Sequence, residues 1–175
     1  MTSIRRVEAS AATQAATGIT HFVFDASSGW KAFGHNDAEI LTGVVSKEKS
    51  GKSVLRLDIH GKHVEITYSI KVDNNSVVID AVVNGTPSKV AFSKEGGLIG
   101  EGFNKTVDPA INEIFRSMHS DLMALRDAPS REGTLRLVVD SNWCGGLSDA
   151  IAGARAAKEW LSVYFLTNSY DCWCR

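Results

Sequence analysis

The stretch Val64-Glu65-Ile66-Thr67-Tyr68-Ser69-Ile70-Lys71-Val72 decides the fold of this chain. Apolar side chains occupy every second position, and polar side chains occupy the positions between them. Because successive side chains of a strand point to opposite faces, this period of two predicts a strand with one buried face and one face toward water. An antiparallel sheet commonly has that arrangement.

The neighbouring segments extend the sheet. Further strands are expected at residues 21–24, 40–45, 54–59, 77–83 and 89–92. The breaks between them include Ser50-Gly51-Lys52 and Asn84-Gly85, and Asn and Gly adopt the positive φ values that tight hairpins require. Residues 19–93 are therefore predicted to form an antiparallel β-meander of about five to seven strands.

The second half of the chain has helical periodicity. Apolar residues spaced by three and four predict amphipathic helices at residues 106–127 and 147–166, with one more strand at 134–140 between them. Residues 1–18 lack such a pattern and are expected to be a mobile leader. The prediction is an α+β protein in which residues 19–175 form a single domain, with the sheet packed against both helices and residues 167–175 as a tail.

Composition limits the functional classes. The chain has 175 residues, 19 basic and 20 acidic side chains and a formal net charge of −1, so no global charge attracts nucleic acid. It has no run of about 18 apolar residues for a membrane helix and no apolar signal-peptide core. The protein is expected to be cytoplasmic as synthesised, with export by a route that needs no such signal left open, and no cofactor or metal site is predicted.

Cys144 is a candidate catalytic nucleophile. It is expected between a strand and a helix, where the positive end of the helix dipole would stabilise a thiolate. One of the five histidines would have to serve as its base, because none lies in a local signature with Cys144. The alternative interpretation is a small buried thiol without catalytic work.

Gly145-Gly146 follows directly and also fits a processing site. Cleavage after Gly146 would release residues 147–175, a helical peptide with a Cys-Trp-Cys end. That peptide has no net charge, whereas membrane-active peptides are usually cationic. A turn between strand and helix is the other interpretation.

The chain ends in Cys172-Trp173-Cys174. Disordered ends seldom contain such residues, so this segment is expected either to be fixed on the body or to contact a partner. One alternative is a Cys144–Cys172 or Cys144–Cys174 disulfide with Trp173 in a groove. The others are modification at Cys172 or Cys174 and docking of a partner or a peptide-processing protein through Trp173.

A second candidate binding segment contains Trp30, Phe33 and His35 in a glycine-bounded loop. Aromatic side chains in exposed loops suit contact with a ligand or a partner. Trp30 and Phe33 would otherwise cover an edge of the sheet.

Together these features predict a non-catalytic protein in which a β-rich domain carries a C-terminal effector or docking segment. Such a protein would be a toxin-like peptide precursor or an interaction protein. The alternative is a small cysteine-dependent hydrolase or transferase that uses Cys144.

Overall fold

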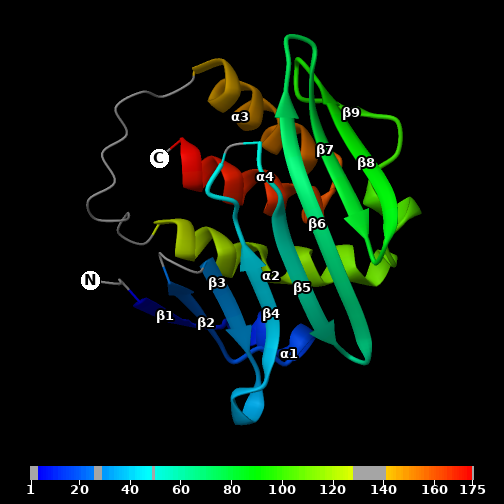
Figure 1. Ribbon diagram of the computed structural model, residues 1–175. Helices are drawn as coiled ribbons and strands as arrows, with labels where there is room; N and C mark the ends of the chain where they lie inside the picture. The colour runs from blue at the N-terminus through cyan, green and yellow to red at the C-terminus, as the bar shows by residue number, and fades with distance from the viewer. Residues whose placement is uncertain (1–3, 26–28, 49, 128–140, 175) are drawn as a thin grey trace.

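The structure is a computed structural model that describes residues 4–25, 29–48, 50–127 and 141–174. Within these ranges the protein is α+β, and nine antiparallel strands form one open sheet in sequence order (Figure 1). The strands are β1 (Ile4–Glu8), β2 (His21–Asp25), β3 (Gly29–Phe33), β4 (Glu39–Val44), β5 (Ser53–Ile59), β6 (Lys62–Val72), β7 (Ser76–Val83), β8 (Thr86–Ser93) and β9 (Leu98–Ile99). The helices are α1 (Ala11–Thr17), α2 (Pro109–Asp127), α3 (Ser141–Ala156) and α4 (Trp160–Trp173), with short 3-10 turns η1 (His35–Asp37) and η2 (Phe103–Lys105).

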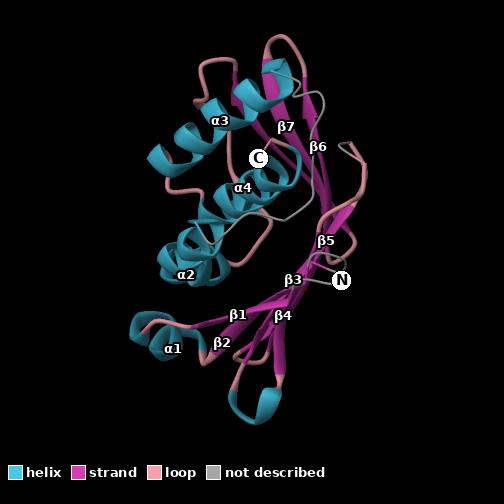
Figure 2. Ribbon diagram, turned by 90° about the vertical axis from the view of Figure 1, so that its left-hand side faces the viewer, coloured by secondary structure: helices cyan, strands magenta, loops and turns pink. Residues whose placement is uncertain are grey.

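The sheet has two unequal faces, as the alternation in residues 64–72 predicts. Figure 2 shows the helices together on one side of the curved sheet, which we call the inner side. Inward-facing side chains of β5 and β6 are buried at every second position, and those between them are half-buried or exposed. The antiparallel meander is confirmed, and it is longer than expected because β1, β3 and β9 add to it.

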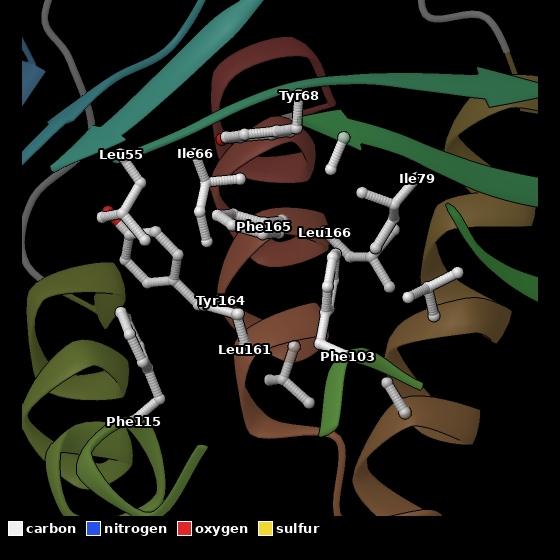
Figure 3. Packing of buried hydrophobic residues seen from close by; sticks show 14 of the residues in the cluster. Leu55, Ile66, Tyr68, Ile79, Phe103, Phe115, Leu161, Tyr164, Phe165 and Leu166 are labelled. Atoms are coloured by element: carbon white, nitrogen blue, oxygen red, sulfur yellow. The ribbon is translucent and has the colours of Figure 1, made fainter. Parts of the chain in front are cut away.

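The core lies between the inner face and helix α4. Phe165 of α4 stacks against Tyr68 of β6 with ring centroids 4.0 Å apart, and it forms a T-shaped pair with Phe103 with ring centroids 5.7 Å apart (Figure 3). The ring centroid of Tyr164 lies 4.9 Å from that of Phe115 of α2. Helix α4 is thus a central element of the domain, with α2 and α3 packed beside it.

The prediction of a mobile leader over residues 1–18 is wrong for residues 4–17, which form β1 and α1. Polar contacts hold this segment to α2. The backbone N–H and the hydroxyl of Ser10 both donate to Asp121 Oδ2, at 3.0 and 3.1 Å, and Thr13 donates to the carbonyl of Ser117. Ser10 also caps α1 by accepting from the Thr13 N–H. Because these contacts are polar, the segment has no apolar pattern that predicts them.

The helix expected at 106–127 is confirmed with a later start. Residues 103–105 form η2, and α2 begins at Pro109, whose missing N–H costs nothing in a first turn. Asp108 acts as the cap, since its Oδ1 accepts from the Ala110 N–H at 2.9 Å. The strand expected at 134–140 lies outside the described residues.

The single helix expected at 147–166 is wrong, because two helices, α3 and α4, cover residues 141–173. Helix α3 ends in a left-handed turn at Lys158, with φ of 58°. The Glu159 N–H donates to the Ala154 carbonyl and the Lys158 N–H to the Arg155 carbonyl, which is the Schellman pattern of helix ends. Glycine usually occupies this left-handed position at a helix end. Because a lysine occupies it here, the sequence gives no signal for the break between the helices.

Asn112 of α2 holds the connection between α3 and α4. Its Oδ1 accepts from the N–H of Trp160 at 2.8 Å and of Leu161 at 3.3 Å, and its Nδ2 donates to the Lys158 carbonyl at 2.9 Å. The side chain of Glu159 does not cap α4. Asn112 therefore supplies the N-terminal cap of α4 from another helix.

We expect Asn112→Ala to lower the free energy of unfolding by about 2 kcal/mol, because a buried cap and its polar partners lose their bonds together. Urea denaturation measures this loss. Asn112→Asp is the matched control, since it keeps the acceptor for α4 and removes only the donor to Lys158. If Asn112→Ala and Asn112→Asp were equally stable, the capping role would be contradicted.

Candidate functional site

The cysteines at the two ends of the α3–α4 pair are joined. Cys144 in the first turn of α3 forms a disulfide with Cys174, which directly follows α4, and their Cα atoms lie 5.8 Å apart. Of the two bridges that the sequence left open, the structure has the one to Cys174. Since the Lys158 turn joins the other ends of these helices, α3 and α4 form a helical hairpin closed at both ends.

The Cys-Trp-Cys end packs on the body. Trp143 and Cys144 are buried, and Trp173 and Cys174 are half-buried against the core. The side chain of Cys172 lies outside the described residues, so its modification stays a prediction. The end of α4 is therefore held at the surface by one covalent bond and by apolar contact, with Trp173 as its partly exposed side chain.

The disulfide involves Cys144, the predicted catalytic nucleophile. In the bonded form Cys144 carries no thiolate, so nucleophilic chemistry would require the reduced chain. Three of the histidines have described contacts with groups other than Cys144. His21 stacks on Phe33, His60 contacts the Ala16 carbonyl and His119 lies against Trp160.

Gly146 lies inside α3 and not in a strand-to-helix turn as expected. A Cβ atom at Gly146 would stand 2.9 Å from Val72 Cγ1, so the missing side chain lets α3 approach β6 closely. Cleavage after Gly146 would separate Cys144 from Cys174 in the sequence, but their disulfide would still join the two pieces. Processing at Gly146 stays a prediction, and release of the peptide would also require reduction.

The other predicted binding residues belong to the sheet. Phe33 of β3 is half-buried and stacks on His21, with ring centroids 5.2 Å apart and planes 16° from parallel. His35 is exposed in η1. Trp30 lies in β3 opposite Phe24 and Gly43, and its side chain is outside the described residues. The structure thus places this group on β3 and η1, while Cys144, Trp173 and Cys174 lie in the helical layer.

A surface that the sequence did not single out lies on the side of the sheet away from the helices, the outer face. All four large hydrophobic side chains that are exposed in the described part of the chain point to this face. They are Ile4 at 64%, Val44 at 41%, Val82 at 40% and Ile99 at 50% of full exposure. Single exposed aliphatic residues are ordinary, but their collection on one face indicates a contact surface.

Three of these side chains belong to one row. The strand register places Val44 opposite Val54, Val54 opposite Thr67, Thr67 opposite Val82 and Val82 opposite Pro87. Ile4 lies at the far end of the same row through β2 and β3. Between Val44 and Ile4 the line passes Gly29 of β3 and Asp25 of β2. We call the residues of this line the outer row; they are Ile4, Asp25, Gly29, Val44, Val54, Thr67, Val82 and Pro87.

Ion pairs flank the outer row. Arg56 Nε lies 3.0 Å from Glu65 Oε2 on one side of it, and Lys71 Nζ lies 3.8 Å from Asp80 Oδ2 on the other. Each pair is neutral overall. An apolar strip between balanced polar pairs has the anatomy of a protein interface, which has an apolar centre and a polar rim.

A cavity of about 250 Å³ opens beside the start of α2. Its lining includes His63, Asn84, Thr106 and the ion pair of Lys62 with Asp108. The hydrogen bond from Lys62 and then that from the Ala110 N–H lower the pKa of Asp108, and the positive charge of Lys62 lowers it further. In this lining the hydroxyl of Thr106 is hydrogen-bonded to the hydroxyl of Ser88, 2.9 Å away.

His119 is a perturbed group of the helical layer. Partial burial, and then the positive charge of Arg155, lower its pKa below the ordinary value of 6.5. Its ring centroid lies 5.0 Å from that of Trp160. The folded protein therefore binds a proton at His119 less readily than the unfolded chain does.

We expect this difference to lower stability as the pH falls through 6.5 toward the folded pKa, because the unfolded state then takes up more protons. Chemical denaturation between pH 7.5 and pH 5.5 measures this slope, and these pH values span about one unit on either side of an ordinary histidine pKa. His119→Gln should flatten the slope. An unchanged slope in His119→Gln would contradict the assignment.

Among the described residues, no three His, Cys, Asp or Glu side chains come together as a metal site requires. No helix in the described ranges is both long and apolar enough to cross a bilayer. Comparison with models of known protein families, with curated protein sequences and with solved structures finds no match to this chain.

Proposed function

We propose that this is a non-catalytic interaction protein whose outer sheet face binds another protein surface. The observation that carries this proposal is the exposure of Ile4, Val44, Val82 and Ile99 on the outer face. Figure 2 shows that none of the described helices covers this face. The ion pairs beside the outer row are neutral, so the face lacks the single-sign charge that binding to nucleic acid or to anionic lipid uses.

In this proposal the C-terminal segment is a structural support rather than a released effector. Phe165 and Leu166 of α4 are fully buried beneath the sheet, so loss of this helix would remove part of the core. The disulfide from Cys144 to Cys174 holds the same helix against α3. The described helices thus cover the inner side of the sheet, and the outer face is left for contact.

Site-specific photo-crosslinking tests this function without knowledge of the partner. A benzophenone amino acid is placed at Val82, and in a control protein at the exposed Lys105 of η2 on the helical side. Both proteins are irradiated in the cells that make the chain. We expect a discrete adduct from Val82 and none from Lys105. Absence of any adduct at Val82, or the same adducts at both positions, would contradict the proposal.

A further inference from the structure

We infer that the outer face binds a second copy of this chain, in a face-to-face dimer with a two-fold axis that runs along the strands between β5 and β6. This inference rests on the proposed function and names the partner of the same surface. It follows from the positions that the strand register gives to the apolar and charged side chains.

The apolar positions of the outer row are self-complementary about this axis. The row runs in the order Val44, Val54, Thr67 and Val82 on the consecutive strands β4, β5, β6 and β7. A two-fold axis between β5 and β6 exchanges β5 with β6 and β4 with β7. Val54 of one copy then faces Thr67 of the other, and Val44 faces Val82. Every apolar position of this strip thus meets a β-branched partner.

The charges match under the same operation. Arg56 on β5 and Glu65 on β6 are directly opposite each other in the row beside the outer row. Exchange of β5 with β6 sets Arg56 of one copy over Glu65 of the other, and the reverse pair forms on the other side of the axis. One surface therefore supplies both partners of each contact, which an isologous interface requires. Two sheets that pack in this way keep their strands within about 30° of one another.

The overlapping area suits a weak, reversible dimer. The four strands β4 to β7 that the axis exchanges span about 19 Å at a spacing of about 4.8 Å. They have 6, 7, 11 and 8 residues, so their mean length is about 26 Å at about 3.3 Å per residue. The product is roughly 500 Å² for each partner, or about 1,000 Å² for both, which is the size of a weak or transient interface.

The edges of the sheet are less suited to self-association than its face. Edge strand β9 has only two residues. Edge strand β1 carries Arg5, Arg6 and Glu8, and charged side chains on an edge oppose the addition of another strand. A dimer built on the outer face is therefore expected to leave both edges free.

Sedimentation velocity of the full, oxidised chain from about 1 to about 500 μM tests the inference, because this range brackets micromolar dissociation. We expect conversion from 18.9 kDa to twice that mass. Val82→Lys should weaken association at least about tenfold, since it places an ammonium group against Val44 of the partner copy. Ala152→Lys is the control, because Ala152 is exposed on α3 in the helical layer, away from the outer face.

A charge exchange tests the register. Arg56→Glu and Glu65→Arg should each weaken the dimer, because like charges would face each other across the axis, and the double variant should restore it. Circular dichroism verifies that each variant is folded. We expect all of them to fold, because the substituted side chains lie on the surface. A monomer at every concentration, a dimer insensitive to Val82→Lys, or a double variant weaker than both single ones would overturn the inference.

The crosslinking experiment separates this inference from the proposed function. An adduct of twice the chain mass from Val82 supports both. An adduct with a different protein, together with a monomer in sedimentation, overturns the dimer and leaves the interaction function standing. Absence of any adduct overturns both.

Discussion

Phe165→Ala is expected to lower the free energy of unfolding by about 4 kcal/mol, the largest effect of any single substitution considered for this protein. Phe165 has no exposed surface and is among the largest fully buried side chains. Its ring meets Tyr68, Phe103 and Tyr164 with centroids 4.0, 5.7 and 5.7 Å away (Figure 3). Truncation would remove these contacts and leave a cavity between α4 and the sheet. Urea denaturation followed by far-UV circular dichroism measures the loss.

Phe33→Ala is the matched control for this prediction. Phe33 is also aromatic, but it is half-buried and stacks on the single ring of His21. We expect its truncation to cost about 1 kcal/mol. If Phe165→Ala cost no more than Phe33→Ala, helix α4 would not be a core element, and the C-terminal segment would again be a candidate for release.

Cys144→Ser is expected to lower the free energy of unfolding by about 3.5 kcal/mol. The bond to Cys174 closes a loop with a sequence separation of 30 residues, and the loop-entropy relation gives about this value for that length. In a protein of this size such a loss corresponds to a melting temperature roughly 10 °C lower. Differential scanning calorimetry of the oxidised protein measures it, and Cys174→Ser should give the same result.

Cys172→Ser is the control, because the bond between Cys144 and Cys174 leaves Cys172 as the third cysteine of the chain. It should not reproduce the loss. Thiol titration of the denatured, oxidised protein should count one thiol, and three after reduction. A stable Cys144→Ser, or a Cys172→Ser variant as unstable as it, would contradict the observed pairing.

The sequence predicted the sheet well because its signal is local. Alternation along residues 64–72 predicts which side chains of one strand face the core. The burial of side chains along β6 follows this alternation in the structure. The break between α3 and α4 has no such signal. Lys158 adopts a left-handed conformation that usually marks glycine, and the cap of α4 comes from Asn112, 48 residues before Trp160. The ties of Ser10 to Asp121 are likewise distant in sequence and polar.

The candidate site was predicted only in part, also for physical reasons. A bridge from Cys144 to the C-terminal cysteines was expected, but the choice between Cys172 and Cys174 depends on the geometry of the last turn of α4. The outer row was missed because it runs across strands. Val44 and Val82 are far apart in the sequence, and only the register of four strands aligns them.

A protein surface is expected to cover the outer face when the protein works, and hydroxyl-radical footprinting can detect that cover. The extent of labelling at Val44 and Val82 is compared between dilute purified protein and the cells that make it, with Lys105 and Arg116 on the helical side as reference positions. We predict that Val44 and Val82 are labelled several times less in the cells while the reference positions are unchanged. Equal labelling of Val44 and Val82 in both settings would contradict the claim.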